Sequence, residues 1–74
     1  MNVQAADKPK PQWRGYTWVQ LQRCAMRELQ WRKRVYPNRV NTHRMRPEAA
    51  AQEIDMMRVI AETMAELAES ERLI

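Results

Sequence analysis

The feature that most constrains the fold is a set of apolar residues that recur at alternating spacings of four and three. They are Ala50, Ile54, Met57, Ala61, Met64 and Ala68. Such spacing places side chains along one stripe of a helix that packs against another helix. Acidic residues repeat every seven positions on the other side, at Glu48, Asp55, Glu62 and Glu69. The pattern predicts a helix over about residues 47–70, with Pro47 at its first position, where a missing N–H costs nothing.

A second amphipathic pattern lies in the first half of the chain and begins with a capping signal. Thr17 and Gln20 have the spacing of a capping box, and Tyr16 and Leu21 stand where a hydrophobic staple places its two apolar side chains. The side expected to face solvent is cationic and polar, with Arg23, Arg27, Gln30 and Arg34. A helix is therefore expected to begin sharply after Thr17.

The end of this first helix is set by Pro37, which disfavours helical geometry in the residue before it. We predict a helix over about residues 17–36 and a connection over 37–46, with one extra helical turn to Val40 as an open alternative. Val40 and Met45 are the expected anchors of the connection in the core. Two amphipathic helices joined in this way form an antiparallel hairpin, so the fold class is all-α, and no stretch alternates with the period of a strand.

The composition of the chain predicts a short N-terminal arm followed by one helical domain. Residues 1–12 contain Lys8-Pro9-Lys10-Pro11 and few apolar side chains, which predicts an extended basic arm before a single domain over 13–74. A hairpin of 74 residues covers each apolar stripe from one side only, so we expect a homo-oligomer. The residues expected at its interface are Trp18, Ile54, Met57, Ala61, Met64 and Leu67.

Charge is divided unequally along the chain. Residues 1–46 hold eleven Lys and Arg against two acids, a balance of +9, and residues 47–74 hold two arginines against seven acids, a balance of −5. Such an asymmetry indicates which partners the protein attracts rather than how it folds. It favours an anionic partner for the first half of the chain.

Several classes of function lack the residues they need. The chain has one His, one Cys and one Gly, so no catalytic triad, metal-ligand cluster or glycine-rich phosphate loop can be assembled, and an enzyme is not expected. The single Cys24, beside Leu21 and Ala25, is expected to be a small buried thiol, and His43 an exposed turn residue. No apolar run spans a bilayer, so we expect a soluble, cytoplasmic protein without cofactors.

The middle of the chain resembles a group of small, uncharacterised proteins encoded by tailed bacteriophages and prophages. The resemblance rests on the run from Arg27 to Pro37, which ends Arg-Lys-Arg-Val-Tyr-Pro, and on the spaced pairs Arg44-Met45 and Glu53-Ile54. Val40, Ala50, Met57 and Ile60 also match, whereas Arg46 replaces a usual Ser or Thr and Ala51 a usual acid. The resemblance implies a viral accessory protein of the kind that counters host defences, acting in the host cytoplasm.

The candidate binding residues combine guanidinium groups with aromatic rings. They are Arg27, Arg34, Arg39 and Arg44, with Trp31 and Tyr36. Guanidinium groups bind phosphates in a bidentate manner, and aromatic rings stack on bases. Two other readings remain open. One is a solvated face balanced by the acidic helix of the same or a neighbouring chain, with Glu53 or Glu48 as partners of Arg34 or Arg44 across the hairpin; the other is a surface for an acidic protein.

Three functions are compatible with this surface. The first is capture of an anionic ligand, in its sharpest form sequestration of a cyclic-oligonucleotide messenger of bacterial immunity. The second is inhibition of a defence complex by protein–protein contact, as in anti-CRISPR proteins. The third is a small DNA- or RNA-binding regulator, although a connection of ten residues exceeds the short turn of a helix-turn-helix motif.

Overall fold

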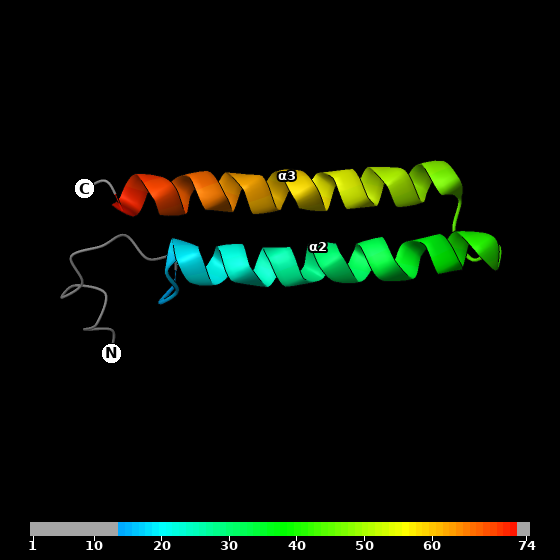
Figure 1. Ribbon diagram of the computed structural model, residues 1–74, viewed down its shortest axis with the longest axis horizontal. Helices are drawn as coiled ribbons and strands as arrows, with labels where there is room; N and C mark the ends of the chain where they lie inside the picture. Colours follow the sequence, from blue (N-terminus) through cyan, green and yellow to red (C-terminus); the bar gives the residue numbers. More distant parts are fainter. Residues whose placement is uncertain (1–13, 73–74) are drawn as a thin grey trace.

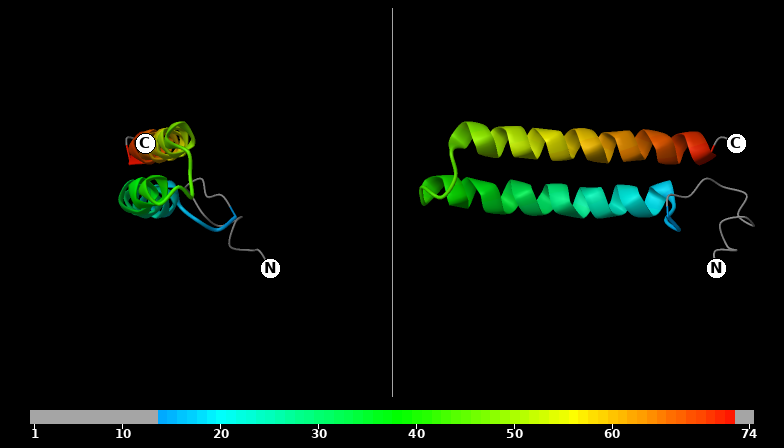
Figure 2. Two further views of the ribbon diagram at one scale, coloured as in Figure 1. Left: turned by 90° about the vertical axis from the view of Figure 1, so that its right-hand side faces the viewer. Right: turned by 180° about the vertical axis from the view of Figure 1, so that it is seen from behind.

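The computed structural model describes residues 14–72, which form two long α-helices and no β-strand. Helix α2 spans Trp18–Asn41 and helix α3 spans Pro47–Arg72. The helices lie side by side and antiparallel along their whole length (Figures 1 and 2). The predicted all-α hairpin is confirmed, and the basic arm predicted for residues 1–12 lies outside the described residues.

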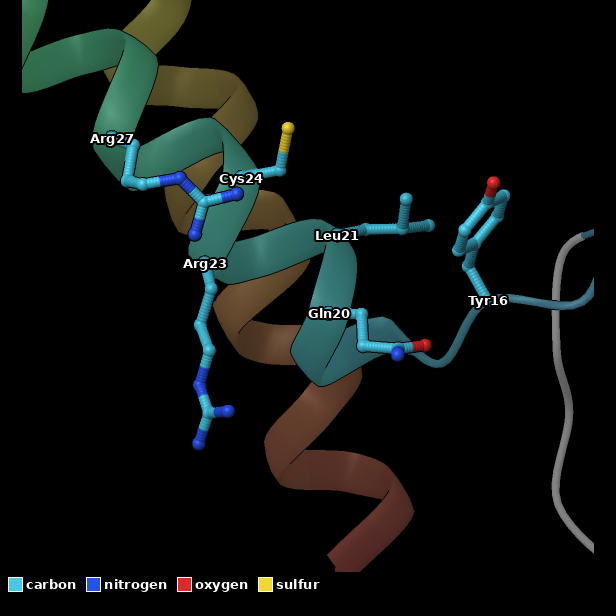
Figure 3. Close-up of a pocket in the computed structure, with 6 residues that line it drawn as sticks. All are labelled: Tyr16, Gln20, Leu21, Arg23, Cys24 and Arg27. Carbon is cyan, nitrogen blue, oxygen red and sulfur yellow. The ribbon is translucent and has the colours of Figure 1, made fainter.

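Helix α2 begins at the predicted capping box. The backbone N–H of Thr17 donates to Oε1 of Gln20 at 2.8 Å, and the backbone N–H of Gln20 donates to Oγ1 of Thr17 at 3.1 Å. Two of the N–H groups that a helix start leaves without partners are thereby satisfied. The side chain of Leu21 extends toward the ring of Tyr16 (Figure 3), as the staple predicts.

The predicted end of the first helix at residue 36 is wrong. Helix α2 continues through Pro37 to Asn41, so the connection shrinks to residues 42–46. Pro37 cannot donate the hydrogen bond that a helix interior expects, but it lies on the exposed side of α2. The preceding Tyr36 is only 8% exposed and packs in the hairpin. We attribute the continued helix to this burial, which offsets the missing bond.

Helix α2 ends in a Schellman motif centred on His43. The N–H of His43 donates to the carbonyl of Val40 at 3.0 Å, and the N–H of Arg44 donates to that of Arg39 at 2.8 Å. These bonds satisfy carbonyl groups that the helix end would leave unpaired. They require a left-handed backbone at His43, which has a φ of 61°. His43 is exposed in the turn, as expected.

The core lies along the seam predicted by the four-and-three spacing. Ala25 and Leu29 of α2 form one cluster with Met57 and Ala61 of α3, and Ile54 packs against it. The other buried apolar residues are Tyr36, Ala50 and Ala68. Alanine at three seam positions lets the helix axes approach closely, so the seam excludes water with few large side chains.

The hairpin forms a layer about one helix thick. Its shortest extent is 14 Å, and a helix with its side chains is about 10–12 Å wide. Both broad faces of the layer are therefore open, and a sizeable fraction of each helix remains accessible. This geometry leaves room for the surfaces described next.

Candidate functional site

An arginine stripe, formed by Arg23, Arg27 and Arg34, runs along α2 on the side away from α3. All three side chains are exposed. Intervals of four and seven residues return a helix to nearly the same direction, so the three side chains share one narrow line. Arg23 and Arg34 are eleven positions apart, which is about 16 Å along the helix axis. The predicted cationic outer face of the first helix is therefore confirmed.

None of these guanidinium groups forms an ion pair with another residue of the described range 14–72. Among residues 14–72, the cations that form ion pairs are Arg32 and Arg58. Glu53 lies with Arg32 rather than with Arg34, and Glu48 has no ion pair with Arg44 within the described part of the chain. The reading in which α3 balances the cationic face is thus wrong for the hairpin itself. The stripe retains its full charge.

Arg32 has a structural role: it forms the i,i+4 ion pair that the spacing of Glu28 and Arg32 predicts, and it also reaches α3. Its Nε donates to Oε2 of Glu28 at 3.0 Å, and its Nη1 donates to the backbone carbonyl of Glu53 on α3 at 2.8 Å. The hydrogen bond to Glu28 raises the pKa of Arg32 above its usual value. Because the side chain bridges one carboxylate on its own helix and one carbonyl on the other, Arg32 holds the two helices in register.

Next to this bridge lies a cation–aromatic cluster formed by Trp31, Tyr36, Arg32 and Arg39. The two rings meet edge to face, with centroids 6.0 Å apart and planes at 77°. The Arg39 guanidinium carbon lies 5.4 Å from the Trp31 centroid and 5.7 Å from that of Tyr36. Arg32 lies 5.8 Å from the Tyr36 centroid. The structure therefore brings together three of the six predicted binding residues.

The role predicted for Tyr36 is wrong. A ring that stacks on a base needs an open face, and Tyr36 is 8% exposed, with Trp31 and two guanidinium groups against its ring. Its interactions stabilise the hairpin instead. Trp31 keeps 37% of its surface exposed and remains available to a partner.

A shallow pocket opens at the N-terminal end of α2 (Figure 3), and we call it the N-terminal pocket. It is lined by Tyr16, Gln20, Leu21, Arg23, Cys24 and Arg27, and its volume is about 530 Å³. Pockets that hold small ligands have volumes of roughly 300–1,000 Å³. The exposed guanidinium groups of Arg23 and Arg27 and the Tyr16 ring, which is 56% exposed, therefore line one concave surface.

The N-terminal pocket contains one predicted residue, Arg27, and several that the prediction missed. Arg23 belongs to the same stripe, so its spacing from Arg27 was a usable signal. The buried thiol predicted at Cys24 is wrong, because Cys24 is exposed. Ala25 and Leu29 occupy the core line, and the neighbouring Cys24 is turned by about 100° to the flank of the helix.

Arg44 lies at the other end of the molecule. It lines a second hollow of about 510 Å³ in the connection, together with Val40, His43, Met45, Arg46 and Pro47. It lies beyond Asn41, the last residue of α2, which is about 21 Å along the helix axis from Arg27 at 1.5 Å per residue. The six predicted residues therefore occupy three places rather than one site. Val40 and Met45, the predicted anchors, are half-buried beside this hollow.

Of the residues predicted at the oligomer interface, some are buried within the hairpin and others remain partly exposed. Met57 and Ala61 are buried against α2 of the same chain, with Ile54 packed beside them. Trp18 and Met64 are half-buried, and Leu67 is 36% exposed. The seam residues predicted to contact a second chain therefore pack mainly between the two helices of the same chain. Other apolar side chains of α3 remain exposed, namely Met56, Val59 and Ile60.

Residues 14–72 contain no group of three or more His, Cys, Asp or Glu side chains that could hold a metal ion. No helix in that range is long and apolar enough to span a membrane. Comparisons of the whole chain with protein-family models, with curated proteins and with solved structures found no match.

Proposed function

We propose that this protein is a non-enzymatic binding protein that captures a phosphate-bearing ligand on the N-terminal pocket and the adjoining arginine stripe. The observation that carries the proposal is the pair Arg23 and Arg27, which are exposed, form no ion pair in the described structure, and line one pocket with the exposed ring of Tyr16. An unpaired cluster of like charges is electrostatically costly in isolation, and a multivalent anion relieves that cost.

The pocket offers complementary contacts to a nucleotide. Guanidinium groups form bidentate hydrogen bonds to phosphate oxygens, and a phenol ring stacks on a base. Arg34 continues the stripe about 10 Å beyond Arg27. A ligand with more than one phosphate can therefore contact the pocket and the stripe together, which favours an oligonucleotide over a mononucleotide.

The sharpest form of the proposal is a cyclic-oligonucleotide messenger of bacterial immunity. The resemblance of residues 24–62 to small phage and prophage proteins supports a counter-defence role in the host cytoplasm. A protein without catalytic residues would act there by stoichiometric sequestration. We further propose that it acts as a homo-oligomer, because a hairpin of one layer leaves large apolar side chains exposed.

Isothermal titration calorimetry with cyclic di- and trinucleotides and with a linear oligonucleotide tests the proposal. We expect saturable binding that Arg27→Glu weakens by at least tenfold. Lys33→Glu is the matched control, because Lys33 is an exposed cation of the same helix that lies about 80–120° around the helix from the stripe residues. The affinity of the Lys33→Glu variant for the nucleotide should stay within about threefold of that of the parent chain. The charge change is the same, but at this position it acts on the ligand from outside the binding site and is weakened by salt.

Three outcomes would count against this function. Absence of heat with every nucleotide at low salt would reject it. Equal losses for Arg27→Glu and Lys33→Glu would show a diffuse charge effect without a site. Equal affinity for linear strands and cyclic messengers, with a steep salt dependence, would replace the messenger by nucleic acid, which the linear form of the stripe also suits.

A further inference from the structure

One broad face of the hairpin carries apolar side chains from both helices. Arg32 and Glu53, which are joined by a hydrogen bond between the helices, point toward this face. Each residue of a helix is turned by 100° from the one before, so the other positions that point toward the same face can be identified. On α2 the apolar positions are Leu21, Cys24, Trp31 and Val35. On α3 they are Met56, Ile60, Met64 and Leu67. We call this set the apolar face.

The apolar face is substantially open in the single chain. Ile60 is 47% exposed, Met56 45%, Trp31 37% and Leu67 36%, and Cys24 is also exposed. On α3 the opposite broad face carries more charge, with Asp55, Arg58 and Glu62 exposed. On α2 the charged Glu28, Arg32 and Arg39 lie among the apolar positions of the apolar face. Large apolar side chains gathered on one face indicate a surface that another molecule covers.

The charges of the two helices indicate what that molecule is. Helix α2 has six cationic side chains and one carboxylate, a balance of +5, and helix α3 has seven carboxylates and two arginines, a balance of −5. A second copy of the chain therefore offers an acidic helix to α2 and a cationic helix to α3. Half of the α2 cations belong to the arginine stripe, which points away from the apolar face, so the charge contrast at that face is smaller and the complementarity acts through the net charge of each helix.

We propose that two copies pair through the apolar face into a four-helix bundle, with α2 of each chain against α3 of the other. Two-fold symmetry permits two ways to stack such layers face to face. A two-fold axis along the helices places α2 on the partner's α3. An axis across the helices places α2 on α2 and α3 on α3, which sets like charges together. Electrostatic repulsion disfavours the second arrangement.

The size of the face suits a stable dimer. Helix α2 is about 36 Å long, and two adjacent helices are roughly 20 Å wide. Each copy thus presents about 700 Å², close to the roughly 800 Å² per partner of a standard interface. All neighbouring helices in this bundle are antiparallel, as in up-and-down four-helix bundles.

The symmetry also determines which residues meet. A rotation about an axis along the helices moves no residue along that axis, so residues that are level within a chain are level between chains. Arg32 and Glu53 lie at the same height along the helix axes, because they are hydrogen-bonded to each other. The core cluster, in which Ala25 and Leu29 pack with Met57 and Ala61, agrees with this alignment of the two helices. Cys24 is therefore level, within about 3 Å, with Thr63. Within one chain these two exposed residues lie toward opposite edges of the layer, whereas across the dimer they lie on the same edge.

This inference deepens the self-association that forms part of the proposed function. Its first test measures mass without any ligand, by sedimentation equilibrium and light scattering. The parent chain should give twice its mass of 8.9 kDa, and Ile60→Glu should shift the dimer dissociation constant by at least about 100-fold. Val59→Glu is the matched control: it introduces the same charge at an adjacent residue that is 52% exposed, but it lies about 100° from Ile60, off the apolar face. Circular dichroism checks that both variants remain helical.

The second test determines whether α2 of one chain lies against α3 of the other chain. Thr63→Cys should give a covalent dimer with a short bis-maleimide through the native Cys24, and the same variant with Cys24→Ser should not. A parent chain of single mass would overturn self-association altogether. A dimer that Ile60→Glu and Val59→Glu weaken equally, or that lacks the Cys24-dependent cross-link, would overturn this interface while leaving self-association and ligand capture intact.

Discussion

Replacement of His43 by glycine should stabilise the protein. His43 occupies the left-handed position of the Schellman motif, with a φ of 61°, and its backbone N–H binds the carbonyl of Val40. A left-handed conformation costs an L-residue about 1–2 kcal/mol, although His tolerates it better than most. Glycine adopts it without that cost, and it loses about 0.5–1 kcal/mol more backbone entropy on folding. The net gain should be about 0.5–1 kcal/mol.

Urea denaturation followed by circular dichroism at 222 nm measures this change. Protein concentration is held constant, because self-association would make the midpoint concentration-dependent. A gain of that size raises the melting temperature of a domain of this length by roughly 2–8 °C. Gln52→Gly is the matched control, since Gln52 is an exposed position in the interior of α3, where glycine should cost about 1 kcal/mol.

The two variants separate the backbone effect from a general effect of glycine. Opposite signs for His43→Gly and Gln52→Gly would support the assigned backbone conformation. If both variants lose stability by similar amounts, the left-handed turn after α2 is not the conformation in solution. A loss confined to His43→Gly would show instead that the histidine side chain itself stabilises the connection.

Two further substitutions test the capping box at the start of α2 and the continuation of α2 through Pro37. Thr17→Ala removes one half of the capping box and should lower the free energy of unfolding by about 1 kcal/mol; an unchanged urea midpoint would contradict the role of the box. Pro37→Ala restores an N–H donor in the interior of α2 and should raise stability by about 1–3 kcal/mol in the same assay. Lower stability of Pro37→Ala would show that the packing of Tyr36 depends on the proline.

The sequence predicted those parts of the fold that depend on local patterns. The alternating spacing of Met57 and Ala61 with their neighbours located the seam, because a side chain's direction on a helix depends only on its position along the chain. The capping box at Thr17 located the start of α2, because both of its hydrogen bonds form within four residues. Neither prediction needed knowledge of the partner helix.

The parts that could not be predicted depend on contacts between the helices. Local rules end the first helix at Pro37, but the burial of Tyr36 against the rest of the hairpin favours its continuation. Cys24 and Ala25 are adjacent apolar residues, and only the direction of α3 decides which of them is buried. The bridge from Arg32 to the carbonyl of Glu53 joins residues 21 positions apart, so no local motif indicates it.

The division of charge between the helices can serve both proposals because the arginine stripe and the middle of the apolar face lie on different sides of α2. Leu21 and Cys24, which line the N-terminal pocket, are the residues that the two surfaces share. The arginine stripe points away from α3, and the middle of the apolar face lies roughly a quarter turn from it at 100° per residue. A partner's α3 that covers the apolar face would bring carboxylates near the flank of α2 while the guanidinium groups of Arg27 and Arg34 stay open. Ile60→Glu should therefore separate the chains without abolishing the heat of ligand binding, and Arg27→Glu should abolish ligand binding without separating the chains. If each substitution removed both properties, the ligand site would be built from two chains.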